Sequence, residues 1–70
     1  MPDWPSSKAS AVLAALVRIG WHVARQAGSH KVLARQGSAN FVFAFHEREE
    51  IGPRMLARIA KRTGLKPTDL

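Results

Sequence analysis

The chain of 70 residues contains no cysteine. This absence excludes both a disulfide framework and a thiolate metal site, and it is compatible with a reducing compartment. A domain of this length buries only roughly 60% of the surface of its unfolded chain, so its core must be economical. The length and the lack of any repeat or linker predict a single domain over residues 1–70.

Long apolar runs are also missing. The longest nearly apolar stretch, Ala9–Val17, is far shorter than the roughly 20 residues that a membrane-spanning helix needs. The first residues, Met1-Pro2-Asp3, lack the basic start of a signal peptide. We therefore expect a cytoplasmic protein that does not associate with membranes.

Acidic residues are scarce over most of the chain, whose formal net charge is +6. None occurs between Lys8 and Phe45, and none between Ile51 and Lys66. The acids gather at the ends and in one cluster: Asp3, Asp69, Glu47, Glu49 and Glu50. Such one-sided charge predicts a polyanionic partner, with nucleic acid as the first candidate. The alternative is a basic surface that only keeps the protein soluble.

Two segments carry the apolar spacing of amphipathic helices. The first follows Pro5-Ser6-Ser7, where Ser6 or Ser7 would cap the helix, and it ends at Gly20. Its apolar stripe is Ala9, Val12, Leu13, Leu16 and Val17. The second opens at Gly52-Pro53 and ends at Gly64. Its apolar stripe is Ile51, Met55, Leu56, Ile59 and Ala60, and its basic stripe is Arg54, Arg58, Lys61 and Arg62.

Three short strands are predicted between these helices, over residues 20–24, 31–35 and 39–46. Turns at Gly28 and Gly37 would join them into an antiparallel meander. The predicted fold is therefore α+β, in the order α-β-β-β-α. Each helix has one apolar stripe and the sheet has one face to cover, so both helices should pack on the same face of the three-stranded antiparallel sheet.

Strand alternation predicts which side chains share a face. Three phenylalanines should face the helices: Phe41, Phe43 and Phe45. If Gln36 pairs with Asn40, and Gln26 with His30, all three histidines (His22, His30 and His46) fall on the uncovered face. In that register Gln26, His30 and His46 lie abreast in one row across the sheet.

The same register makes two cations neighbours. Arg25 and Lys31 would face each other on the helix side, unless they reach outward at the sheet end or a bulge near Gly28 turns them away. Either arrangement leaves two cations beside His30, where a phosphate group could bind.

Two imidazoles beside cations suit the cleavage of RNA, which carries its own nucleophile, the 2′-hydroxyl. A metal-free nuclease needs a base for that proton, an acid for the departing 5′-oxygen, and cations for the charge on phosphorus. Histidine fills both proton roles near neutrality. We predict His30 as the base or acid, His46 as its partner, and Arg25 or Lys31 as phosphate clamps. The expected products are a 2′,3′-cyclic phosphate and a 5′-hydroxyl.

No helical histidine spacing or thiolate pair supports a metal site made of His30, His46 and a glutamate, so neither a metal nor another cofactor is expected. His22 is interpreted as a surface residue. The predicted RNA-binding residues are Arg25, Gln26, Ser29, Lys31, Arg54, Arg58 and Lys61.

The chain also resembles a known family. Gly20-Trp21 leads into Arg25-Gln26-Ala27-Gly28-Ser29-His30, an apolar strand ends in His46, and Gly64-Leu65 closes a basic helix. This pattern, from about Ser6 to Leu70, resembles the HicA toxins, small mRNA interferases of bacterial toxin–antitoxin pairs with a fold like the double-stranded-RNA-binding domain. The resemblance implies that His30 is catalytic, that mRNA is cleaved without metal in the cytoplasm, and that a HicB-type antitoxin neutralises the toxin.

Two other functions remain open from the sequence. One is a non-catalytic RNA-binding module on the same fold, and the other is a protein-interaction domain whose charge serves an acidic partner. A reader of duplex RNA is disfavoured because Ala27-Gly28-Ser29 is too short to enter a minor groove. In addition, Lys61-Arg62 lies late in the last helix.

Overall fold

The computed structural model of the chain describes residues 4–70, and the interpretation of Met1-Pro2-Asp3 lies outside the described residues. In chain order the elements are β1 (Ser7–Lys8), α1 (Ala9–Arg18), β2 (His22–Ala27), β3 (His30–Ala34), β4 (Phe41–Ala44), β5 (Glu50–Ile51), α2 (Pro53–Thr63) and the 3₁₀ helix η1 (Pro67–Asp69). The predicted α-β-β-β-α order is confirmed. Strands β2, β3 and β4 form one antiparallel sheet with β3 in the centre.

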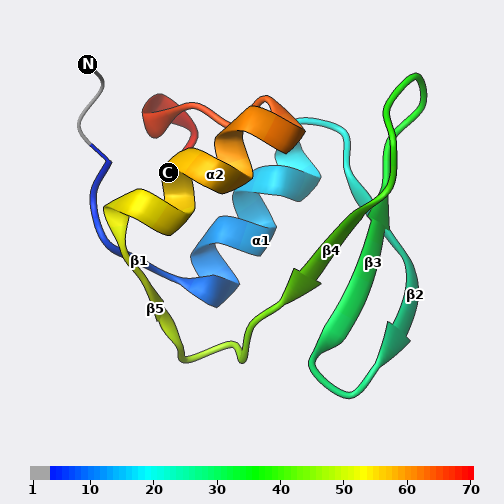
Figure 1. Cartoon of the computed structure of the whole chain (residues 1–70), viewed down its shortest axis with the longest axis horizontal. Coiled ribbons are helices and arrows are strands. Elements are labelled where there is room, and N and C mark those ends of the chain that lie inside the picture. Colours follow the sequence, from blue (N-terminus) through cyan, green and yellow to red (C-terminus); the bar gives the residue numbers. More distant parts are fainter. Residues whose placement is uncertain (1–3) are drawn as a thin grey trace.

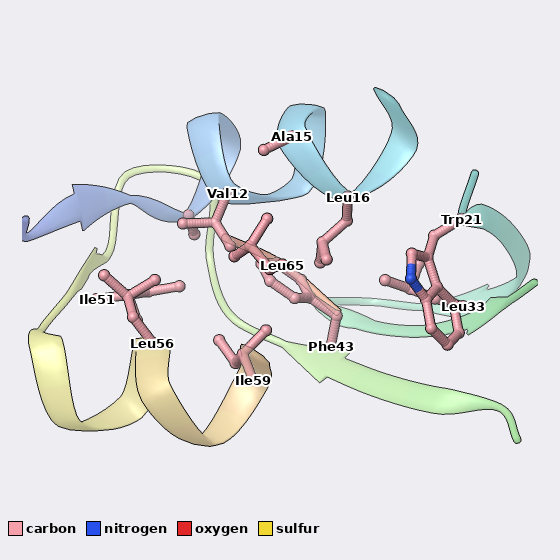
Figure 2. Close-up of a cluster of buried hydrophobic side chains, with 11 residues drawn as sticks. Val12, Ala15, Leu16, Trp21, Leu33, Phe43, Ile51, Leu56, Ile59 and Leu65 are labelled. Carbon is pink, nitrogen blue, oxygen red and sulfur yellow. The ribbon is translucent and has the colours of Figure 1, made fainter. Parts of the chain in front are cut away.

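Both helices lie on the same side of this sheet, as Figure 1 shows. The residues between them form one hydrophobic core, drawn in Figure 2. Its largest members are Trp21, Leu33 and Phe43 from the sheet side, Leu16 from α1, and Leu56 and Ile59 from α2. The predicted packing of the helices against the phenylalanine face is therefore confirmed, because Phe43 is buried and Phe41 and Phe45 pack against the core.

Helix α1 begins differently from the prediction. Ser7 and Lys8 form β1, which pairs with β5, so neither Ser6 nor Ser7 is the cap. The first N–H groups of the helix donate instead to a distant loop, from Ala9 to the Glu49 carbonyl at 2.8 Å and from Ser10 to the Glu47 carbonyl at 3.1 Å. Sequence patterns did not indicate this two-stranded sheet, because its pairing joins segments more than 40 residues apart.

The other end of α1 follows the prediction. Gly20 adopts a φ of 107°, and its N–H donates to the Val17 carbonyl, while the Trp21 N–H donates to the Leu16 carbonyl. This is the Schellman arrangement that glycine permits at a helix end. The apolar stripe is rotated slightly from the prediction: Ala15 is buried, whereas Val17 is 51% exposed.

Helix α2 begins at Pro53 and stops before Gly64, which adopts a φ of 80°, as predicted. Its carboxyl end is fixed by two contacts to buried groups. The Trp21 indole Nε1 donates to the Thr63 carbonyl at 3.1 Å, and the Thr63 hydroxyl donates to the Ile59 carbonyl at 2.8 Å. Met55, expected in the apolar stripe, is 39% exposed and instead borders a groove described below.

The pairing of β3 with β4 is offset by two residues from the predicted register. Leu33 pairs with Phe41 and His30 with Ala44, so His46 is not opposite His30. The connecting loop is longer than expected, and its first residue, Arg35, lies over the Trp21 ring at 4.8 Å. Because the offset is even, the face assignments of both strands survive.

The pairing of β2 with β3 contains a bulge between Val23 and Arg25. Before it, Val23 pairs with Leu33 as predicted; after it, Arg25 pairs with Val32 and Ala27 with His30. The predicted pairing of Gln26 with His30 is therefore wrong. Because Ala24 is an extra residue, the side chains that follow it in β2 point to the opposite face from the one predicted.

None of the helices in residues 4–70 is long and apolar enough to cross a bilayer.

Candidate active site

The turn between β2 and β3 consists of only two residues, Gly28 and Ser29. Gly28 has a φ of 60°, and within residues 4–70 only glycines have positive φ values. Glycine first and a residue with negative φ second is the pattern of a type II′ hairpin turn. The Gln26 amide Nε2 donates to the Gly28 carbonyl at 3.1 Å and fastens the turn. His30, the next residue, thus starts β3 at a fixed position.

His30 is exposed on the face of the sheet that the helices leave open. Its direct cross-strand neighbours are two alanines, Ala27 on β2 and Ala44 on β4. A phosphate group can therefore reach the imidazole without meeting a large side chain. The prediction that His30 points to solvent from a central strand is confirmed.

The bulge brings Arg25 onto this same face. Arg25 pairs with Val32, which makes it a diagonal neighbour of His30, roughly 7–8 Å away by the usual sheet spacing. Lys31 pairs instead with Gln26 and Phe43 on the helix side, so the predicted like-charged pair of Arg25 and Lys31 does not form. A bulge does separate the two cations, but it lies before Arg25 and not near Gly28.

A groove of about 320 Å³ lies beside the turn, and we call it the hairpin groove. Its lining residues are Gln26, Gly28, Ser29, Lys31, Phe45, His46 and Glu47. Gln26 and His46, which were predicted to flank His30, both line this groove. His30 itself does not line it. The predicted row of Gln26, His30 and His46 across one face is therefore wrong: His46 follows the end of β4, and Gln26 lies past the bulge.

The loop that carries His46 is held at several points. The His46 N–H donates to the Glu49 carboxylate at 3.3 Å, and the Glu49 N–H donates to the His46 carbonyl at 3.0 Å. The carbonyls of Glu47 and Glu49 accept the first N–H groups of α1. These backbone hydrogen bonds and the Glu49 carboxylate hold the loop that forms one wall of the hairpin groove. Within residues 4–70, no group of three His, Asp or Glu side chains is placed to hold a metal ion.

A second groove, of about 290 Å³, lies between β4 and α2, and we call it the α2 groove. Its lining is mostly apolar, with two arginines: Phe41, Val42, Ala44, Phe45, Met55, Arg58, Ile59 and Arg62. Val42, on the open face of the sheet, is 54% exposed. Ala44 lines this groove and is also the direct cross-strand neighbour of His30, so the groove lies along the edge strand β4 next to the His30 site.

The cations of the chain divide into two groups. Arg35 packs over Trp21 and donates to the Ile19 carbonyl at 3.3 Å, and Arg18 donates to the Asp69 carbonyl at 2.6 Å. These two arginines make contacts within the fold. The predicted RNA-binding residues Arg54, Arg58 and Lys61 are exposed along α2, and of these Arg58 lines the α2 groove.

Sequence reasoning missed two residues of the site. Phe45 was assigned to the core, and Glu47 only to the acidic cluster, yet both line the hairpin groove. The available signal was their position on either side of His46.

The model of one protein family matches most of this chain. It describes the HicA toxin of bacterial toxin–antitoxin systems, and the match covers residues 9–65. No curated protein and no solved structure gives a significant match. The matched region runs from the start of α1 to just past α2, and it includes the β2–β3 hairpin with His30 and the loop with His46. The chain therefore belongs to the HicA family of bacterial toxins.

Proposed function

We propose that this toxin is a metal-independent endoribonuclease that cleaves mRNA in the cytoplasm, with His30 as its principal catalytic residue. Membership of a toxin–antitoxin family implies an antitoxin partner. The observation that carries the proposal is the position of His30: it is exposed, central in the sheet, flanked by two alanines and diagonal to Arg25.

The reaction begins when the 2′-oxygen of the RNA attacks the adjacent phosphorus. A P–O bond forms to the 2′-oxygen, the bond to the 5′-oxygen breaks, and a 2′,3′-cyclic phosphate and a 5′-hydroxyl result. The 2′-hydroxyl loses a proton and the 5′-oxygen gains one, and an imidazole can serve either transfer. Arg25 stabilises the negative charge that develops on the phosphoryl oxygens.

His46 remains the second catalytic candidate in this proposal. It is exposed at the same end of the sheet as His30, but in the hairpin groove and not directly across from it. We therefore expect His30 to carry the larger share of catalysis. Lys31, Gln26 and Ser29 contact the RNA from the hairpin groove, and Arg54, Arg58 and Lys61 contact it along α2.

His30→Ala is expected to lower cleavage by at least 100-fold while RNA affinity and folding are retained, since general acid–base groups contribute roughly 10²–10⁴-fold. Cleavage is measured in EDTA, and the new 5′ ends are tested for a free hydroxyl. His22→Ala is the matched control, because His22 is exposed on the same face of the sheet but lies on β2 opposite Ala34, at the end of β3 far from His30. Cleavage by His30→Ala at the rate of the His22→Ala control would disprove the assignment.

A modified substrate distinguishes the two proton roles. RNA with sulfur in place of the bridging 5′-oxygen needs no proton on its leaving group, because thiols are much stronger acids than alcohols. If His30 is the acid, His30→Ala cleaves this substrate at nearly the wild-type rate. If His30 is the base, the defect persists. Binding of intact RNA without any cleavage by the wild type would instead favour the non-catalytic RNA-binding module.

A further inference from the structure

We propose that the hairpin groove is a nucleobase-binding site that selects, next to the cleaved phosphate, a base that carries an exocyclic amine and discriminates against uracil. The inference rests on the proposed ribonuclease function for the identity of the ligand, single-stranded RNA. It assigns a role to Phe45 and Glu47, which the acid–base chemistry at His30 does not use.

One wall of the groove is an aromatic ring that is held in place. The Phe45 ring contacts the buried Phe43 ring edge to face, with centroids 5.1 Å apart and an interplanar angle of 65°. Phe45 is only partly buried, so part of it remains open to the groove. Single-stranded bases stack on such rings, and one stack changes affinity on the order of tenfold or more.

The polar lining suits a base better than a phosphate. Glu47 brings a carboxylate into the groove, and its negative charge opposes a phosphate there. In the groove, the positive charge of Lys31 balances the negative charge of Glu47. On the other face of the sheet, neither Arg25 nor His30 has an acidic residue directly opposite it on a neighbouring strand. The arrangement favours a phosphate at His30 and a base in the groove.

The groove offers both acceptors and donors: the Glu47 carboxylate only accepts hydrogen bonds, whereas the Lys31 ammonium only donates them. The Gln26 amide already uses its Nε2 for the Gly28 carbonyl, which leaves Oε1 free. Cytosine offers its N4 amine to such acceptors. Adenine and guanine also carry amines. Uracil instead has a carbonyl oxygen where cytosine has its amine, and an N3–H where cytosine has an accepting ring nitrogen, so in the same position its oxygen faces the Glu47 carboxylate and its N–H faces the Lys31 ammonium. The groove therefore discriminates most sharply between cytosine and uracil, rings of the same size and shape.

The site is built in advance and lies close to the scissile phosphate. The loop with Phe45 and Glu47 is fixed by the carbonyl contacts to α1, and the opposite wall by the two-residue turn. Ser29 lines the groove, His30 follows it on the open face, and Lys31 lines the groove again. Because Ser29 and Lys31 flank His30 in the chain, in this proposal the RNA passes around the end of the β2–β3 hairpin, with the base of a nucleotide near the cleaved phosphate in the groove.

Binding is measured without cleavage, with His30→Ala as the background and fluorescent single-stranded RNAs that differ only by one cytosine or uracil. We expect about tenfold tighter binding of the cytosine RNA. Glu47→Gln, which adds an amide donor of the same size, should reduce this ratio below threefold. The matched control is Glu50→Gln: it changes the net charge equally on β5, outside the hairpin groove, and should keep the ratio.

Equal binding of the two RNAs, or an unchanged ratio in Glu47→Gln, would overturn the base-site proposal. Cleavage by the wild-type toxin is measured separately on both RNAs. Cleavage without base preference refutes the base site and leaves the nuclease intact. Base preference in binding without any cleavage supports the base site and refutes the nuclease.

Discussion

Two alanines decide how accessible the proposed catalytic residue is. His30 lies between Ala27 and Ala44, its direct cross-strand neighbours, and the distance between such Cβ atoms is about 4.5–5.5 Å. At that spacing a larger side chain would occupy the volume beside the imidazole where a phosphate has to bind. The small size of these neighbours is therefore as much a part of the proposed site as the imidazole.

Ala44→Val tests this at the scale of one side chain. Valine suits a strand, so the fold is expected to persist, but its methyl groups would displace the phosphate beside His30. We expect cleavage to fall roughly tenfold, since small misplacements of reacting groups are costly. Ala34→Val is the control, because Ala34 shares the open face but pairs with His22 at the far end. Equal activity of the two variants would contradict this account of the site.

At the scale of the elements, the faces of β3 and β4 could be predicted from sequence, whereas their register and the faces of β2 beyond the bulge could not. The alternation of Phe41, Phe43 and Phe45 placed His30 on the open face, and the even offset between β3 and β4 preserved that assignment. The offset goes with a longer β3–β4 loop, in which Arg35 lies outside the sheet and packs on Trp21. Such a long-range contact leaves no periodic signal in the sequence.

The bulge in β2 and the start of α1 were unpredictable for related reasons. Nothing local marks Ala24 as an extra residue, yet it moves Arg25 to the face of His30. Likewise, the carbonyls of Glu47 and Glu49 replace the predicted serine cap and fix the His46 loop. The candidate histidine could be found by local reasoning, whereas its neighbours are set by contacts distant in the sequence.

The stacking of Arg35 on Trp21 links the α1–β2 junction to the β3–β4 loop. Arg35→Ala removes this cation–π contact and the hydrogen bond to the Ile19 carbonyl, and it should lower the free energy of unfolding by about 1–2 kcal/mol. Urea denaturation measures the loss. RNA affinity at a temperature where the variant is folded should change little, in contrast to Arg25→Ala. A stable Arg35→Ala protein with weakened RNA binding would mean that Arg35 is an RNA contact.

At the scale of the whole molecule, the α2 groove joins two surfaces that a partner can use together. It begins beside His30 at Ala44, passes the edge of β4 and reaches Arg58 and Arg62 on α2. The outward N–H and C=O groups of an edge strand, the exposed Val42 and Met55, and the two arginines suit a partner with an apolar, acidic segment. We propose that the antitoxin covers this groove, and that RNA leaving the His30 site follows the same path.

The two partners should then compete. In a complex of His30→Ala toxin with its antitoxin, hydrogen exchange should be slowed in β4 and α2, and RNA should no longer bind. Arg58→Gln should weaken both partners and reduce the slope of log affinity for RNA against log salt by about 0.7, the loss of one phosphate contact. Lys66→Gln, an equal charge change on an exposed residue outside both grooves, should leave the slope unchanged.

If neither the open sheet face nor α2 is protected from hydrogen exchange in the complex, the antitoxin acts from another surface. In that case neutralisation does not occur by blocking the path of the RNA.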